Sequence, residues 1–165
     1  MSRTLYFICP TDCIESIISE EFGGEHYFFT SLGNSLNFDA ETVGKIFDLI
    51  ESKRINEISF VLSSKNKIVL DALGKQDFLG LDGLRDFYIL VKKEKEYSQD
   101  LWQTSDPQFL ISSYHLKTKV EELKLELEGL FFNQIPIKAR IYQAQEGVFR
   151  EIYADPILKE KVSLN

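Results

Sequence analysis

The sequence predicts an α/β domain of three layers, in which a mainly parallel sheet of about four to five strands is flanked by helices. Short runs rich in β-branched and aromatic residues alternate with segments of helical apolar periodicity. Of the 165 residues, 44% are hydrophobic and 27% are charged, a composition typical of a folded globular protein. Two β-rich runs near the end of the chain add a C-terminal antiparallel strand or hairpin. The length fits one domain, residues 1–165.

The first predicted unit is a strand followed by a helix. Residues 4–9 form an apolar run of β-formers, and Pro10 ends it because proline cannot donate to a ladder. Thr11 or Asp12 can then cap a helix that extends through Glu21, since isoleucines recur at helical spacing on one face.

Two further strands and two helices follow in alternation. The strands are predicted at 26–31 and 57–63, where aromatic and β-branched residues cluster. An amphipathic helix is predicted from Asp39 to Lys53, because its apolar residues recur at steps of three and four. A short helix that Gly74 ends is predicted after the third strand. This alternation is typical of parallel βαβ units with right-handed crossovers.

The middle of the chain fits two patterns. The apolar run 84–91 can be a strand or a buried helical segment, and we favour a strand at 86–91. A long helix is predicted after Asp106-Pro107 from an apolar repeat of three and four residues. The repeat consists of Leu116, Val120, Leu123, Leu127 and Leu130. This stripe faces the core or another copy of the chain, and two heptads are too few for a coiled coil, so core packing is favoured. The alternation at 123–127 leaves a strand as the less favoured alternative.

The end of the chain predicts a β-hairpin. Two β-rich runs between Ile137 and Tyr153 flank a turn that contains Gly147.

Charge and composition exclude several classes of partner. The chain has 19 basic and 26 acidic residues and a formal charge of −7, so nucleic acid and anionic membranes are poor partners. The longest apolar runs fall far short of the ~20 residues that span a bilayer, so we expect neither a transmembrane helix nor a signal peptide. Two cysteines four residues apart need not be oxidised, and we expect a cytoplasmic protein.

Cysteine and histidine are the scarce residues that carry metal or thiol chemistry. Cys9 and Cys13 lie at a predicted strand-to-helix junction, where helix amides stabilise a thiolate. Their spacing differs from the C-x-x-C of zinc ribbons and thioredoxin-like enzymes, so small core cysteines are the favoured interpretation. His26 and His115 have no metal ligand beside them in the sequence. Folding can still join Cys9, Cys13, His26 and His115 in a metal site, or place Cys13, His115 and a carboxylate in a nucleophilic site.

A turn offers the next candidate for a ligand crevice. The residues 31–35 follow a predicted parallel strand, at the end where open α/β sheets bind ligands. A purely structural turn is the favoured interpretation. The glycines elsewhere fit neither the phosphate loop nor the Rossmann fingerprint.

Several segments, taken in order, match the motifs of one family. Ile8-Cys-Pro-Thr-Asp-Cys13 corresponds to a first strand ending in C-x-D-x-R, and Thr30-Ser-Leu-Gly-Asn34 is similar to R-N-A-G-N. The helix 39–53 is similar in place to one that begins S-x-x-Y-A, and residues 58–67 correspond to a strand ending in G-H-x-x-C-G. These motifs are those of the β-class carbonic anhydrases.

The second half of the chain continues the resemblance. Residues 117–123 look like the family's N-V-x-x-Q-x-x-x-L helix. Residues 139–149 look like its closing strand, G-x-x-Y-D-x-x-T-G-x-L. The chain therefore resembles the β-carbonic anhydrases in the order of its pieces, and this implies their fold and a homodimer.

The chain departs from the family at the zinc ligands. In that family the first Cys, the His and the second Cys hold zinc, and an Asp-Arg pair gates the fourth position. Cys9 alone is retained here, because the His position falls at Ser63 or Ser64 and the second Cys at Asn66 or Lys67. A zinc-hydroxide mechanism needs the bound metal, so we expect no metal, no cofactor and no hydratase activity.

The gating pair changes as well, since the Asp falls at Thr11 or Asp12 and the Arg near Cys13. The resemblance implies a non-catalytic, zinc-free domain that serves as a binding or interaction protein for an unknown ligand. An enzyme with a rebuilt crevice, in which Cys9 and Cys13 act as thiol or metal ligands, is the alternative. The candidate pocket residues are Cys9, Asp12, Asn34, Ser63, Ser64 and Lys67.

Overall fold

A computed structural model describes residues 1–97, 106–130 and 134–152. Its centre is a five-stranded sheet of order β2-β1-β3-β4-β5. The strands are β1 (Arg3–Ile8), β2 (Glu25–Thr30), β3 (Glu57–Ser63), β4 (Ile137–Gln143) and β5 (Val148–Ile152). The first four are parallel, and β5 pairs antiparallel with β4. The predicted α/β class, with its C-terminal hairpin, is confirmed.

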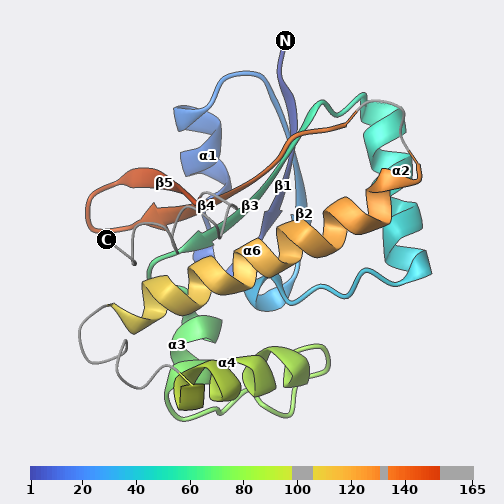
Figure 1. Ribbon diagram of the computed structural model, residues 1–165. Helices are drawn as coiled ribbons and strands as arrows, with labels where there is room; N and C mark the ends of the chain where they lie inside the picture. Colours follow the sequence, from blue (N-terminus) through green and yellow to red (C-terminus); the bar gives the residue numbers. More distant parts are fainter. Residues whose placement is uncertain (98–105, 131–133, 153–165) are drawn as a thin grey trace, which may run out of the picture.

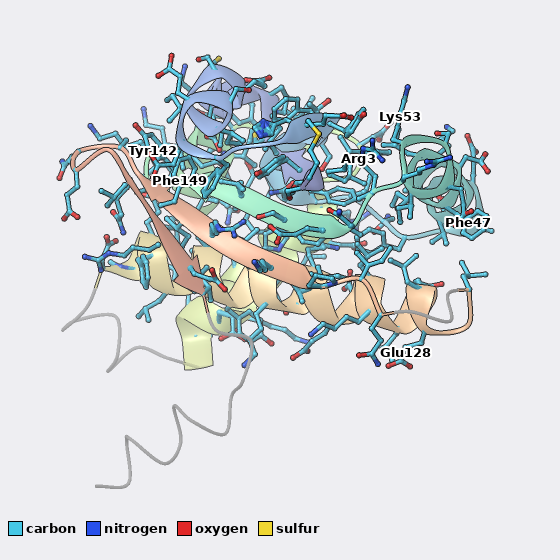
Figure 2. All side chains as sticks on the ribbon, turned by 90° about the horizontal axis from the view of Figure 1, so that it is seen from above. Arg3, Phe47, Lys53, Glu128, Tyr142 and Phe149 are labelled. Atoms are coloured by element: carbon cyan, nitrogen blue, oxygen red, sulfur yellow. The ribbon has the colours of Figure 1, made fainter. Side chains whose placement is uncertain are left out.

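Helices cover both faces of the sheet. On one face lies α1 (Glu15–Glu21), and on the other α2 (Ala40–Lys53) and the long α6 (Pro107–Glu128), as Figures 1 and 2 show. The helices α3 (Lys67–Leu73) and α4 (Arg85–Tyr97) pack together beyond the carboxyl ends of the strands (Figure 1). None of the helices described is long and apolar enough to cross a membrane.

The predicted strand at 86–91 is wrong, because these residues lie within α4. The buried side chains around it are spaced as one face of a helix: Leu84, Phe87, Tyr88 and Val91. Ile89, between them, is exposed, whereas alternation in a strand would place it on the same face as Phe87 and Val91. The fourth parallel strand is β4 instead.

The first helix begins later than predicted. A single 3-10 turn, η1 (Pro10–Asp12), follows β1, and α1 starts only at Glu15. Cys13 separates the two with a left-handed backbone, φ 51°. The residues Thr11 and Asp12 therefore do not cap α1, and the side chain of Asp12 is free to reach β3.

The long helix α6 is confirmed, and it begins at Asp106-Pro107 as predicted. The Asp106 carboxylate accepts hydrogen bonds from the backbone amides of Gln108 and Phe109, and Pro107 occupies the first turn. The stripe residues Leu116, Val120, Leu123 and Leu127 are buried in the main core. The core-facing interpretation is confirmed for these four residues, whereas Leu130, the fifth of the repeat, lies beyond the end of α6 and is 47% exposed. The strand alternative at 123–127 is wrong, because these residues lie within α6.

The sheet separates two apolar clusters. The larger lies between the sheet and α2, α3, α4 and α6, and contains Phe7, Phe60 and the stripe of α6. The smaller lies under α1 and is built on Tyr6, Ile8 and Val61. On the side of α1, Tyr142 and Phe149 pack together on the hairpin with ring centroids 4.9 Å apart (Figure 2).

Candidate functional site

The order of the strands creates one switch point at the carboxyl edge of the sheet. The strand β1 has β2 on one side and β3 on the other, so the connections that follow β1 and β2 leave in opposite directions. In open α/β sheets ligand crevices form at such a point. Cys9 and η1 follow β1, a second 3-10 turn, η2 (Leu32–Asn34), follows β2, and Ser63 ends β3.

Asp12 lies at this edge of the sheet and contacts two segments that follow β1 in the sequence. One carboxylate oxygen, Oδ2, accepts the backbone N–H of Ser63 at 2.9 Å, and Oδ1 accepts the side-chain amide of Asn66 at 2.8 Å. The Oδ1 of Asn66 in turn accepts the N–H of Val69 at 3.0 Å and caps α3. A single carboxylate thus ties the end of β1 to the start of α3. We call Asp12, Ser63 and Asn66 the Asp12 network.

The electrostatics of Asp12 reflect two opposed effects. Burial raises the pKa of the Asp12 carboxyl above its usual value, because the charged form loses water. The hydrogen bonds from Ser63 and Asn66 oppose this by stabilising the carboxylate. Asn66 is completely buried, so its side chain fills the space beside the carboxylate.

Cys9 lies next to the network and has its own partners. Its Sγ accepts the backbone N–H of Gly33 at 3.1 Å and lies 3.1 Å from the Thr11 hydroxyl. Cys9 is 0% exposed, whereas Cys13 is exposed and its Sγ lies 3.5 Å from the Pro10 carbonyl. Both cysteines are free thiols. Cys9 is therefore a core residue whose sulfur bonds η2 to the end of β1.

Asn34 has a structural role at the same edge. Its Nδ2 donates to the carbonyl of Phe7 at 3.2 Å and to that of Val61 at 3.0 Å, which joins the ends of β1 and β3. The neighbouring Gly33 has φ 62°, and an added Cβ would lie 2.9 Å from a methyl group of Ile68. Both residues of the Gly-Asn turn therefore have structural roles: Gly33 adopts a left-handed backbone without a Cβ, and Asn34 joins two strands.

His115 fastens the other side of the turn. Its Nε2 lies 2.8 Å from the Gly33 carbonyl and 3.1 Å from that of Asn34. Burial, reinforced by the nearby Lys119 ammonium, lowers the pKa of His115 to about 4. The ring is therefore neutral at pH 7, and its Nε2–H donates to these carbonyls.

The structure separates the predicted pocket residues into two groups. Cys9, Asp12, Asn34 and Ser63 lie together at the carboxyl ends of β1, β2 and β3. Two others point elsewhere. The Ser64 hydroxyl accepts the Ala144 N–H at 3.1 Å in the hairpin, and Lys67 is exposed.

The family's G-H-x-x-C motif can be aligned with Ser63 and Asn66 or with Ser64 and Lys67. Ser63 and Asn66 both bond to Asp12, which favours the first alignment. Asn66 belongs to the site but was not among the predicted pocket residues. Its position immediately before the predicted helix is an N-cap signal that could have identified it.

The four candidate metal ligands are not brought together. His26 lies at the start of β2, opposite Thr4, with its ring edge against Tyr6. This position is roughly 13 Å of strand from the carboxyl edge, at ~3.3 Å per residue. In the described part of the chain, no three His, Cys, Asp or Glu side chains are placed to hold a metal ion. The family's zinc therefore does not fit, because hydroxyl and amide groups stand where imidazole and thiolate would be needed.

Comparison with solved structures identifies the fold. The β-carbonic anhydrase CafD of Aspergillus fumigatus matches with a TM-score of 0.75 and 16% identity, over 93% of this chain and 90% of that chain. CafA of the same fungus matches with a TM-score of 0.72 and 20% identity, over 99% of this chain and 81% of that chain. A tetrameric β-carbonic anhydrase of Sordaria macrospora matches with a TM-score of 0.71 and 14% identity, over 92% and 80%.

No protein-family model matches the sequence, and a search of curated proteins finds no match. The chain has the β-carbonic anhydrase fold, which confirms the fold that the sequence resemblance implied. The TM-scores show the fold alone, so the chemistry has to be argued from the site itself.

Proposed function

We propose that this protein is a non-catalytic member of the β-carbonic anhydrase fold that binds a ligand or partner and holds no zinc. The observation that supports this most directly is the Asp12 network. Asp12, Ser63 and Asn66 satisfy one another where the family's metal would need two more ligands beside Cys9. Without a metal to bring the pKa of bound water to ~7, the hydration of carbon dioxide has no catalyst at this site.

The test is a carbon dioxide hydration assay on the full chain with zinc added. We expect a rate equal to the uncatalysed rate measured in the same buffer. A β-carbonic anhydrase assayed in parallel controls for the assay itself. Catalysis that scales with the concentration of this protein would overturn the proposal.

We propose in addition that the protein forms a homo-oligomer, most simply a dimer. The Sordaria macrospora neighbours are tetrameric. The buried residues of the α6 stripe belong to the core, so the C-terminal hairpin is the better candidate for a surface of self-association. Among the described residues its strand β5 pairs with β4 alone, and Val148 on it is 44% exposed.

Light scattering after gel filtration tests the assembly. We expect a mass of at least twice the 19.1 kDa of one chain, and a reduction on Val148→Lys but not on Leu125→Lys, an exposed site on α6. A wild-type mass of one chain would contradict the oligomer. We also place the protein in the cytoplasm, which its two free thiols support.

A thiol enzyme is the second candidate, and one observation favours it. The Gly33 N–H and the Thr11 hydroxyl each lie 3.1 Å from the Cys9 sulfur, so the sulfur is held in a polar setting at the end of β1. Burial of Cys9 opposes this role, since a substrate has no access to its sulfur. Alkylation with iodoacetamide under native conditions distinguishes the two candidates, because a binding protein reacts at Cys13 alone and a thiol enzyme also at Cys9.

A further inference from the structure

A cleft separate from the Asp12 network runs between α4, α6 and two loop segments. Its inner part is a recess of about 210 Å³ between α4 and α6. Its outer part, about 790 Å³, lies over residues 79–83 and the exposed side of α4. Asn37, Gly83 and Asp86 line both parts, so the recess opens directly into the outer part.

The inner end of the cleft holds one carboxylate without a cationic partner. Lys119 and Glu122 on α6 line the recess and pair with each other, Nζ to Oε2 at 2.9 Å. Asp86 on α4 lines the recess as well, and among the described residues it forms no ion pair. The pair on α6 is neutral, so Asp86 leaves the inner end with one negative charge.

Oxygen acceptors surround this charge. The Ser35 hydroxyl lines the recess, is buried and makes no hydrogen bond. Among the described contacts, Glu122 accepts the Lys119 ammonium through Oε2 and has Oε1 left to accept another donor. With the Asp86 carboxylate, three residues therefore offer oxygens to a ligand. A primary ammonium group has three N–H donors, so it matches this set.

The outer part of the cleft carries the opposite charge. Arg85 and Lys92 lie two helical turns apart on one side of α4, and both line this part together with Asp82. Within the part of the chain that the structure describes, none of the three forms an ion pair. Two cations and one carboxylate leave one positive charge. The guanidinium of Arg85 has paired N–H donors, which suit the carboxylate of a ligand.

The charges of the cleft therefore balance in sum but are separated in space. The negative end is the recess, and the positive end is the outer part. Arg85 and Asp86 are consecutive residues, with Cα atoms ~3.8 Å apart, so the two ends meet at the start of α4. A ligand that complements both ends carries an ammonium and a carboxylate at short separation, whereas an ion of one sign complements only one end.

We propose that this cleft binds a free α-amino acid, whose ammonium group lies in the recess beside Asp86 and whose carboxylate lies beside Arg85. The inference goes beyond the absence of catalysis proposed above. A negative result here would leave that proposal untouched, because no residue of the Asp12 network lines the cleft.

Three matched probes separate the two charges. L-Alanine carries both, L-alaninamide carries only the ammonium, and N-acetyl-L-alanine carries only the carboxylate. Each is titrated at about pH 6, below the α-amino pKa of ~8, and binding is followed in amide NMR spectra. We expect saturable shifts for alanine at residues 35–37, 83–92 and 118–122. Each analogue should bind roughly three- to fivefold more weakly, the effect of one exposed ion pair. An analogue that binds as tightly as alanine, or the lack of saturable shifts in the cleft, would overturn the proposal.

Two variants assign the ends of the ligand. Asp86→Asn should weaken the binding of alanine and alaninamide roughly three- to fivefold and leave that of N-acetylalanine unchanged. Arg85→Gln should weaken alanine and N-acetylalanine by a similar factor and leave alaninamide unchanged. Asp48→Asn removes an exposed carboxylate on α2, outside the cleft, and should alter none of the three affinities. If the three probes responded alike to Asp86→Asn and Arg85→Gln, the assignment of the two charges would be wrong.

Discussion

At the scale of single residues, the Asp12 carboxylate is the group that holds the end of β3 and the start of α3 in place. The substitution Asp12→Ala leaves the Ser63 N–H and the Asn66 amide without their acceptor. We expect a loss of roughly 1–3 kcal/mol in the free energy of unfolding, the cost of buried polar groups left unpaired. Urea unfolding measures it, with Asp48→Ala on the exposed side of α2 as the control. An effect no larger than that of the control would contradict the role of Asp12.

His115 makes stability depend on pH with a defined sign. Its pKa is about 4 in the folded protein, below the usual 6.5, so the unfolded chain takes up a proton first as the pH falls. Its contribution is therefore present above pH 6.5 and is lost between that pH and 4, by roughly 3 kcal/mol in total. Unfolding at a series of pH values should give a steeper loss for the wild type than for His115→Gln. Parallel pH profiles would contradict this assignment.

Residue types alone could indicate part of the site. Cys9, Asp12, Asn34 and Ser63 lie at one edge of the sheet, because parallel strands bring their carboxyl ends together there. That they line a ligand pocket stays a prediction. Asn66 was named as a possible position of the second Cys but not as a pocket residue, since its contact with Asp12 joins residues 54 positions apart in the chain. Ser64 and Lys67 were included because sequence alone left the alignment of this segment open by one residue.

At the scale of elements, two leucines of α6 test which face of this helix packs on the sheet. Leu123 is 0% exposed and faces the sheet, whereas Leu125, two residues later, is 70% exposed. We expect Leu123→Ala to cost ~2–5 kcal/mol through the lost contacts and the cavity that remains. Leu125→Ala should change stability by less than ~0.5 kcal/mol. Thermal or urea unfolding of the two variants checks this, and similar losses from both would contradict the stripe.

Helices with recognisable caps were predicted well, whereas α1, which has no side-chain cap, begins later than predicted and α4 was predicted as a strand. The helices α2, α3 and α6 each begin at an Asp or Asn whose side chain accepts a backbone N–H. The helix α4 contains an apolar run, Phe87 to Val91, which fits a buried strand equally well. The buried residues Leu84, Phe87, Tyr88 and Val91 recur at helical spacing. Their burial depends on contacts with distant segments, which the local sequence does not show.

At the scale of the whole molecule, the fold is that of the β-carbonic anhydrases, whereas the residues at the family's zinc-ligand positions differ. The fold matches the β-carbonic anhydrases at identities of 14–20% among the neighbours compared. Apolar burial and βαβ connections require only the right pattern of residues, so they tolerate this divergence. A zinc site requires particular ligands and is lost with two substitutions.

The most direct measurement of the central claim is zinc bound per chain after equilibration with zinc and removal of free metal. We expect no stoichiometric zinc for the wild type. The variant Ser63→His with Asn66→Cys, which replaces two members of the Asp12 network beside Cys9, should bind one zinc. Ser63→His with Lys67→Cys should bind none, because Lys67 is exposed and the Asn66 side chain still fills the crevice. One tightly bound zinc per wild-type chain would contradict the account.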